Sequence, residues 1–319
     1  MRIVIPGGTG QVGTLLARAF HADGHEVVVL SRRPAPAPWR IAKWDARTVG
    51  PWAAELEGAD AVINLAGRNV NCRYSPQNRR DIMSSRVESA SAVGQAIARC
   101  DHLPSVWLQA STATIYAHRF DAPNDEASGV IGGAERDVPA SWRFSIEVAT
   151  AWEHAAREAV PAGTRLVLLR SAMVMSPDAG GIFATLLRLV RFGLGGPVAG
   201  GRQYVSWIHE RDFVRSIYWL IAHPELSGAV NIASPHPVPY RDFMRTLRRA
   251  AGVPIGLPAT RWMLALGTWA LRTESELVLK SRRVIPGRLL ASGFTFDYSE
   301  WQAAAESLVQ RPESRVRAV

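Results

Sequence analysis

Three glycines near the amino terminus, Gly7, Gly10 and Gly13, have the spacing Gly-x-x-Gly-x-x-Gly. They follow the apolar run 3–5 and precede apolar residues at helical spacing, which predicts a strand, a tight turn and a helix. The first turn of that helix offers free N–H groups at the positive end of the helix dipole, and this favours a pyrophosphate. Glycine lets the backbone turn and approach such a ligand. The segment therefore predicts a dinucleotide site, with a glycine-rich turn that binds nothing as the alternative.

The residues after the second expected strand, 26–30, indicate which dinucleotide binds. An NAD site places Asp or Glu here to hold the ribose 2′-hydroxyl. This chain has Ser31, Arg32 and Arg33 instead. Guanidinium groups suit a 2′-phosphate because they bind it through two parallel hydrogen bonds. We therefore predict NADP(H) over NAD(H), and the alternative is that both arginines are merely solvated.

Strands and helices alternate along the first half of the chain. Buried strands are expected at 59–67, 105–110 and 165–170, and a further short one at 229–233. Helices are expected at 79–99, 143–158, 182–192 and from about 211 onward. This alternation predicts an α/β fold with a Rossmann-type, doubly wound parallel sheet, which binds ligands at the carboxyl ends of its strands.

The pattern changes after about residue 175, and from about 235 it indicates a smaller, mostly helical C-terminal lobe with a late element at 293–296. We expect residues 1–178, with about 205–234, to form the NADP(H)-binding domain. Residues of about 179–204 and 235–310 are expected to form a substrate lobe, followed by a frayed tail at 311–319.

Composition disfavours several classes of protein. The net charge is +9, but the basic residues are scattered with no run of five, so a nucleic-acid surface is not expected. Two cysteines, Cys72 and Cys100, predict a reducing, cytoplasmic environment. No apolar run approaches the ~20 residues that span a bilayer, so no membrane association is expected. The most apolar segment, 262–271, is expected to be a buried helix or a lobe interface, with a membrane anchor as the alternative.

The chain resembles the extended short-chain dehydrogenase/reductases in its glycine spacing, in Asn-Leu-Ala-Gly at 64–67 and in Ala-Ser-Thr-Ala-Thr-Ile-Tyr at 110–116. It is more similar still to a branch of uncharacterised epimerase-like proteins that carry a C-terminal domain of unknown function. The motifs shared with that branch include Ser-Arg-Val-Glu-Ser at 85–89, Gln-Tyr-Val-Ser-Trp-Ile-His at 203–209 and the segment 283–294. The resemblance covers about residues 1–308, and it implies an NADP(H)-binding domain with a lobe that closes over a substrate cleft.

The glycine motif and the resemblance together predict a set of cofactor-binding residues. Arg86 stands where many extended members have a structural Asn, so its side chain is expected to reach the cofactor or a substrate anion. The full set is Gly7, Thr9, Gly10, Gln11, Val12, Gly13, Ser31, Arg32, Arg33, Leu65, Ala66, Gly67, Arg86, Ala110, Ser111 and Arg170.

One departure from the family pattern bears on catalysis. Most members use a Tyr followed four residues later by a Lys, which lowers the pKa of the phenol so that it can act as an acid or a base. The only lysines here are Lys43 and Lys280, and the residues four positions earlier are Trp39 and Glu276. The chain therefore cannot contain this pair, and the helix that should carry it reads Phe-Ser-Ile-Glu-Val-Ala at 144–149.

Three residues remain as catalytic candidates. By resemblance, Thr112 matches the Ser or Thr that hydrogen-bonds the reacting oxygen, although a Thr hydroxyl is a poor base without help. Tyr116 could face the substrate and Glu126 could supply a carboxylate, and each of the three has a structural role as its alternative. No His-Glu-x-x-His or paired-Cys spacing occurs, so no metal is predicted, and no Gly-x-Ser-x-Gly elbow indicates a hydrolase.

These features predict an NADP(H)-dependent oxidoreductase or epimerase-like enzyme acting on a small carbonyl, alcohol or sugar-nucleotide-like substrate. Because the Tyr and Lys pair is missing, a non-catalytic NADP(H)-binding redox sensor or scaffold is the alternative. Substrate identity and oligomeric state stay open at this stage.

Overall fold

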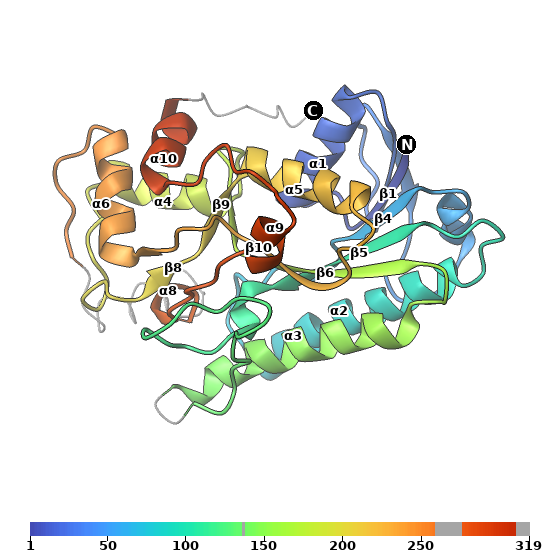
Figure 1. Ribbon diagram of the computed structural model, residues 1–319, viewed down its shortest axis with the longest axis horizontal. Coiled ribbons are helices and arrows are strands. Elements are labelled where there is room, and N and C mark those ends of the chain that lie inside the picture. The colour runs from blue at the N-terminus through green and yellow to red at the C-terminus, as the bar shows by residue number, and fades with distance from the viewer. Residues whose placement is uncertain (136–137, 259–275, 311–319) are drawn as a thin grey trace.

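Runs of Val, Ile and Leu form the strands of a central parallel sheet, in a computed structural model that describes residues 1–135, 138–258 and 276–310 (Figure 1). Every strand pairing in the sheet is parallel, and the order is β10-β6-β5-β4-β1-β2-β3. The seven strands are β1 (Arg2–Pro6), β2 (Glu26–Ser31), β3 (Arg40–Lys43), β4 (Ala61–Asn64), β5 (Val106–Thr112), β6 (Arg165–Ser171) and β10 (Gly228–Ile232). The strand order reverses between β1 and β4, and the carboxyl ends at such a point border the ligand crevice of doubly wound sheets. The predicted fold class is confirmed.

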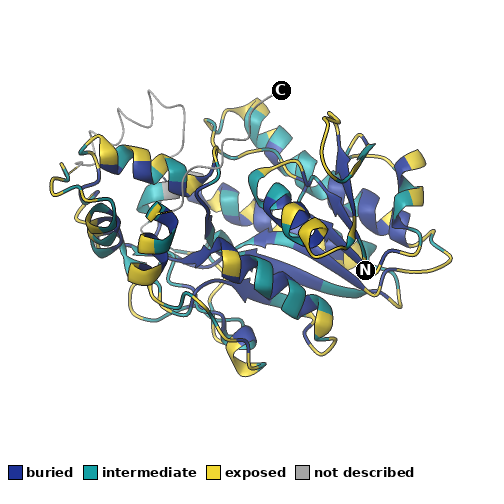
Figure 2. Ribbon diagram, turned by 90° about the horizontal axis from the view of Figure 1, so that it is seen from above, coloured by how far each residue is buried: buried dark blue, intermediate teal, exposed yellow. Residues whose placement is uncertain are grey.

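Helices cover both faces of the sheet, because alternate strand residues point to opposite sides. On one face Ile3 and Ile5 pack with the helices α1 (Gln11–Ala22) and α5 (Glu210–Ala222). On the other face Val4 packs with α2 (Pro76–Ile97), α3 (Ala140–Ala159) and a 3₁₀-helix at Pro51–Leu56. Figure 2 shows the buried strands between helices whose outer faces are exposed.

The second half of the chain builds a separate, mostly helical core beside the sheet (Figure 1). Phe243 stacks on Trp301 with ring centroids 4.0 Å apart, and Trp207 meets the edge of the same indole. The elements of this part are β7 (Met173–Met175), α4 (Ile182–Arg191), β8 (Tyr204–Val205), β9 (Trp207–His209), β11 (Val238–Pro239), α6 (Tyr240–Ala250), α8 (Glu276–Leu279) and α10 (Trp301–Gln310). Helix α9 (Gly287–Ala291) instead packs its Leu289 on the core of the sheet. Lys280 donates a hydrogen bond to the Thr114 carbonyl, so the lobe adjoins the carboxyl end of β5.

Two expectations about elements were wrong. The edge strand β3 was not expected, because its residues, Arg-Ile-Ala-Lys, form no apolar run. Residues 293–296, expected to form an element, form no regular structure. Gly293 instead ends α9 with φ +86°, and Phe294 returns to the apolar core of the sheet.

Two expected features, the apolar segment 262–271 and the tail 311–319, lie outside the described residues. Within the described residues, no helix combines the length and the apolar character that crossing a membrane requires.

Candidate functional site

A pocket of about 630 Å³ lies at the carboxyl ends of β1, β2 and β4, at the reversal of strand order. It brings together nine of the predicted cofactor-binding residues from three separate parts of the sequence. The lining residues are Gly7, Thr9, Gly10, Leu30, Ser31, Arg32, Arg33, Trp44, Ala46, Leu65, Ala66, Gly67, Arg68 and Ser85. We call this space the nucleotide pocket.

The glycines of the first turn serve different ends. Gly7 has φ +76°, and a Cβ there would lie 2.6 Å from Cα of Ala66. A Cβ at Gly13 would lie 2.4 Å from Cα of Gly8, so this glycine permits close packing and does not line the pocket. A Cβ at Gly10 would meet only the Gly7 carbonyl oxygen, at 3.9 Å, so the space beside Gly10 is open. The open space at the uncapped start of α1 fits a pyrophosphate.

The next two helix residues face away from this space. The Gln11 side chain lies against Gly181, where an added Cβ would fall 2.1 Å from its Nε2, and Val12 packs on the core of the sheet. Only the backbone N–H groups of Gln11 and Val12 remain suited to contact a ligand at the helix start.

The rim of the nucleotide pocket is positively charged. The Ser31 hydroxyl accepts a hydrogen bond from the Arg33 backbone N–H at 3.2 Å, which fixes the turn after β2. The Arg32 and Arg33 guanidiniums are exposed, and neither makes a hydrogen bond or ion pair with the described residues. None of the described lining residues is Asp or Glu. This donor set fits a 2′-phosphate better than a free 2′-hydroxyl.

Five of the lining residues were not among the predicted cofactor-binding residues, and one of them, Leu30, ends the expected strand 26–30. Trp44 and Ala46 follow the unexpected strand β3, and Ala46 has φ +65°, which is uncommon for a residue other than glycine. Asp45 stabilises this turn by accepting hydrogen bonds from two backbone N–H groups. In the sequence, an Asp outside the expected strands and helices was the only indication of such a turn. The other two lining residues, Arg68 and Ser85, come from the loop after β4 and from α2.

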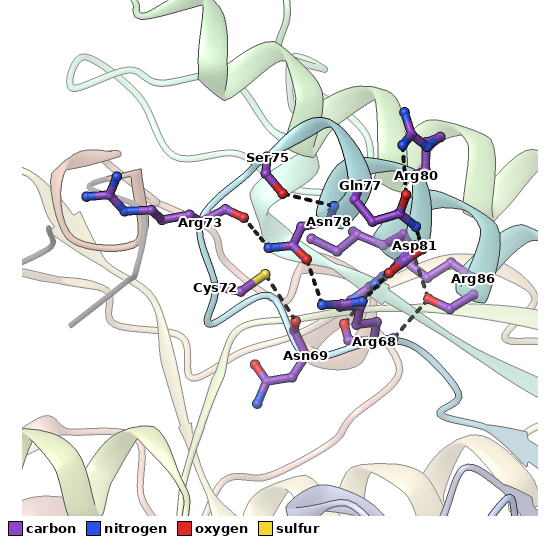
Figure 3. Close-up of polar contacts among 12 residues, drawn as sticks. Arg68, Asn69, Cys72, Arg73, Ser75, Gln77, Asn78, Arg80, Asp81 and Arg86 are labelled. Carbon is purple, nitrogen blue, oxygen red and sulfur yellow. Dashed lines mark hydrogen bonds and ion pairs between the residues drawn. The ribbon is translucent and has the colours of Figure 1, made fainter. Parts of the chain in front are cut away.

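Arg68 is already neutralised within the nucleotide pocket. Its guanidinium pairs with Asp81 and donates to the Asn78 side chain at 2.7 Å (Figure 3). Its carbonyl oxygen accepts a hydrogen bond from Arg86 at 3.0 Å. The loop that carries Arg68 is therefore held from two sides by α2.

A second pocket, of about 250 Å³, is lined by the end of β5 and by Arg86, whose guanidinium also contacts Arg68 of the nucleotide pocket. We call it the inner pocket. Helix α3 presents Ser145 and Ala149 to it, one turn apart, in the helix where the family places its Tyr and Lys. The lining residues are Val70, Tyr74, Ile82, Arg86, Ser111, Thr112, Thr114, Phe144, Ser145, Val148, Ala149, Trp152 and Glu276.

Thr112 is the one catalytic candidate of the three that lines the inner pocket. Its Oγ1 accepts the Thr114 backbone N–H at 3.1 Å, and the hydroxyl hydrogen donates to none of the described residues. A hydroxyl in this state can donate a hydrogen bond to a ligand oxygen. The neighbouring Ser111 hydroxyl is engaged, since it donates to Glu153 at 2.7 Å.

Arg86 lies between the two pockets. It donates to the carbonyls of Arg68 and Ile82, and its guanidinium carbon is 4.9 Å from the ring centre of Trp152. Burial lowers the pKa of Arg86 to about 10, and no carboxylate of the described residues pairs with it. Such a cation attracts an anionic group of a ligand.

The structure places Tyr116 and Arg170 in a buried network, and neither lines either pocket. Arg170 donates to both oxygens of Glu153, at 2.8 and 2.9 Å, and to the Tyr116 hydroxyl at 3.0 Å. That hydroxyl donates to Asn231, and burial raises the pKa of Tyr116. A phenol with this environment is an unsuitable acid near neutral pH.

Glu126 and Ala110 also lie outside the described pocket linings. The Glu126 carboxylate accepts the backbone N–H of Asn231 at 2.7 Å and that of Arg288 at 3.2 Å. Burial raises the pKa of this carboxyl. These contacts tie its loop to β10 and α9, so they account for the residue structurally.

Metal-ligand geometry is missing from the described residues, where no group of three or more His, Cys, Asp or Glu side chains could hold an ion. Cys72 and Cys100 are both free thiols.

Comparisons with known proteins match both parts of the chain. A model of the NAD dependent epimerase/dehydratase family matches residues 3–233, and a model of a domain of unknown function, DUF1731, matches residues 259–308. Epimerase family protein SDR39U1 of Bos taurus is 33% identical over 316 residues, covering 97% of this chain and 100% of that protein.

Two solved structures are also similar. The crystal structure of human epimerase family protein SDR39U1 (isoform 2) with NADPH has a TM-score of 0.84 and 30% identity, and covers 98% of this chain and 100% of that one. A nucleoside-diphosphate sugar epimerase from Corynebacterium glutamicum has a TM-score of 0.75 and 27% identity, and covers 97% of this chain and 58% of that one.

Proposed function

We propose that this chain, which belongs to the NAD dependent epimerase/dehydratase family of extended short-chain dehydrogenase/reductases, is an NADP(H)-dependent oxidoreductase or epimerase-like enzyme. Its substrate is a small carbonyl or alcohol compound, with sugar-nucleotide-like molecules among the candidates. The observation that carries the proposal is the nucleotide pocket with its arginine rim, together with an inner pocket that contains Thr112 and Arg86, which donates to the Arg68 carbonyl.

The choice of NADP(H) rests on the chemistry of the rim. The start of α1 and the loop 65–67 would hold the pyrophosphate and ribose, while Arg32 and Arg33 would hold the 2′-phosphate. The similar human protein was crystallised with NADPH, which supports the same preference. When bound, the nicotinamide supplies or accepts a hydride.

The residues of the inner pocket have distinct roles in this proposal. Thr112 donates a hydrogen bond to the reacting oxygen, and Arg86 attracts an anionic part of the substrate or cofactor. The apolar side chains Phe144, Val148 and Trp152 exclude water from the reacting centre.

We assign residues 1–178, with about 205–234, to nucleotide binding, and about 179–204 and 235–310 to the substrate lobe. The two free cysteines agree with a reducing compartment such as the cytoplasm.

Titration calorimetry with NADPH and NADH tests the cofactor. We expect NADPH to bind roughly tenfold tighter or better, which corresponds to about 1.4 kcal/mol. Tighter binding of NADH would contradict the proposal.

A non-catalytic sensor or scaffold is the second candidate, favoured by the absence of the usual Tyr and Lys from the helix segment 144–149. Transfer of deuterium from C4-deuterated NADPH to a panel of aldehydes and ketones separates the two. Transfer to any member supports the enzyme. No transfer, together with protein partners that differ between the NADPH and NADP⁺ forms, supports the sensor.

A further inference from the structure

Two parts of the chain that are 131 residues apart meet at the wall of the inner pocket. Glu276, the first residue of α8, is 2% exposed, and its Oε2 accepts a hydrogen bond from Ser145 Oγ at 2.6 Å. Both residues line the inner pocket. A buried carboxylate thus contacts a hydroxyl on α3, within the segment 144–149 where the resemblance places the missing Tyr and Lys.

Lys280 follows one helical turn after Glu276 and is 1% exposed. Its Nζ lies 3.7 Å from Glu276 Oε1 and donates to the Thr114 carbonyl at 2.8 Å. Arg282 donates to the Thr114 hydroxyl at 3.1 Å, and the Thr114 N–H donates to Thr112. A continuous set of polar contacts therefore joins Ser145 and Glu276 to Thr112.

The charged groups around Lys280 oppose one another. Burial is the main cause that lowers its pKa and Arg282 lowers it too, while Glu276 and Glu135 raise it, and together these groups bring the pKa of Lys280 to about 8. Burial and the nearby Lys280 both lower the pKa of the His118 imidazole. A lysine in these surroundings exchanges its proton close to neutral pH.

We propose that Ser145 and Glu276 are the proton-transfer pair of the inner pocket, with Lys280 as a positioning residue, so that the C-terminal part of the chain supplies what the missing Tyr and Lys would. The inference rests on the proposed function and names the group that completes it.

The proton movements balance in both directions. When an alcohol is oxidised, its hydroxyl proton passes to Ser145 Oγ while the proton of Ser145 passes to Glu276 Oε2. The electron pair of the O–H bond becomes the carbonyl π bond, and the hydride from carbon goes to the oxidised nicotinamide of the proposed function. In a reduction the same protons return from Glu276 through Ser145 to the oxygen of the product.

The first test measures deuterium transfer from C4-deuterated NADPH to the aldehydes and ketones. We expect Glu276→Gln and Ser145→Ala to lower the transfer rate roughly 10²-fold or more, while the Kd for NADPH stays within about twofold because neither residue lines the nucleotide pocket. Ser145→Thr keeps a hydroxyl and should restore most of the rate. The exposed carboxylate of Glu306 provides the matched control, Glu306→Gln, which should leave the rate unchanged.

The second readout does not depend on activity. Lys43 and Lys280 are the only lysines of the chain, so labelling lysine with ¹³C at Cε gives two NMR signals. We expect the Lys280 signal to titrate near pH 8 in the wild type and at lower pH in Glu276→Gln, which removes a charge that raises this pKa. The exposed Lys43 in β3 provides the reference signal.

The outcomes separate the inference from the function on which it rests. Wild-type transfer that persists in Glu276→Gln and Ser145→Ala overturns the proton-transfer pair and leaves the enzyme. A Lys280 pKa that does not change in Glu276→Gln overturns the role of Lys280. Absence of transfer by the wild type overturns the proposed enzyme and this inference with it.

Discussion

Ser111 and Thr112 are neighbours at the end of β5, yet their hydrogen bonds differ. The Ser111 hydroxyl donates to the buried Glu153 carboxylate, whereas Thr112 uses its oxygen as the acceptor and keeps its hydrogen for a ligand. At the rim, the guanidiniums of Arg32 and Arg33 likewise form no ion pair with the described residues. Donors without partners beside a pocket are the residues on which ligand affinity should depend most.

Replacing the rim arginines should therefore change cofactor preference. We expect Arg32→Ala with Arg33→Ala to weaken NADPH binding roughly 10- to 100-fold, since hydrogen bonds to charged groups contribute about 1.5–3 kcal/mol. NADH binding should change by less than about threefold, because NADH lacks the 2′-phosphate. Calorimetry with both cofactors measures this, and Arg80→Ala, in an exposed arginine outside the pocket, is the control. Equal weakening of both cofactors would contradict the assignment.

Replacing Tyr116 distinguishes a structural role of this residue from a catalytic one. Tyr116→Phe leaves the Asn231 oxygen and one Arg170 N–H without a partner, which should lower the free energy of unfolding by about 1–3 kcal/mol. The rate of deuterium transfer per folded molecule should stay the same. Chemical denaturation and the transfer assay measure the two effects. Tyr218→Phe, which removes a surface hydrogen bond to Asp23, should cost less stability, and a large loss of rate in Tyr116→Phe would restore its catalytic candidacy.

At the scale of elements, the local sequence pattern was sufficient to locate those strands whose burial requires apolar residues. The strands are buried over 3–5, 27–30 and 167–169, and the unbroken apolar runs at these residues identified them. The edge strand β3 reads Arg-Ile-Ala-Lys and has no fully buried residue, so no such run marked it. Sequence patterns therefore predicted the glycine turn and the arginine rim but not Trp44 or Ala46, which depend on β3.

Helix α8 shows a second limit. The sequence alone shows that no Tyr stands four residues before Lys280. No local pattern, however, indicates that Glu276 contacts Ser145, which lies 131 positions away. That contact depends on how the C-terminal part packs beside β5. For the same reason Tyr116 and Glu126 were sensible candidates by residue type, and only tertiary structure assigned their side chains to buried contacts.

The burial of Lys280 beside α8 predicts an unusual pH dependence. Its pKa falls from 10.5 to about 8 on folding, so between these values the unfolded chain binds more protons and stability rises with pH. We expect the free energy of unfolding of the wild type, relative to Lys280→Met, to increase by on the order of 1–3 kcal/mol from pH 8 to 10.5. Denaturation curves at several pH values measure it. The exposed Lys43→Met should show no such trend, and parallel curves for Lys280→Met and the wild type would contradict the prediction.

At the scale of the whole molecule, the two family matches are joined at several buried places. Glu276 meets Ser145 at the inner pocket, and the Asn124 backbone N–H donates to the Arg283 carbonyl at 2.7 Å. Asn231 of β10 donates its side-chain amide to the Ile285 carbonyl. The C-terminal part is thus attached to the sheet by backbone and side-chain bonds around the pocket that it helps to line, so damage to one attachment should weaken the pocket and the fold together.

Asp212 provides the attachment that is most open to test. Its carboxylate is fully buried at the start of α5 and accepts the backbone N–H groups of Asp297 and Tyr298 at 2.9 and 2.8 Å, as well as Arg215 at 3.0 Å. In Asp212→Asn only the amide oxygen can accept a hydrogen bond, and the NH₂ group faces a backbone N–H donor. The free energy of unfolding should therefore fall by about 1–3 kcal/mol. Denaturation with and without NADPH measures this, and the partly exposed Asp242→Asn should cost less than about 1 kcal/mol. Equal stability of Asp212→Asn and the wild type would show that this buried carboxylate does not hold the C-terminal segment to α5.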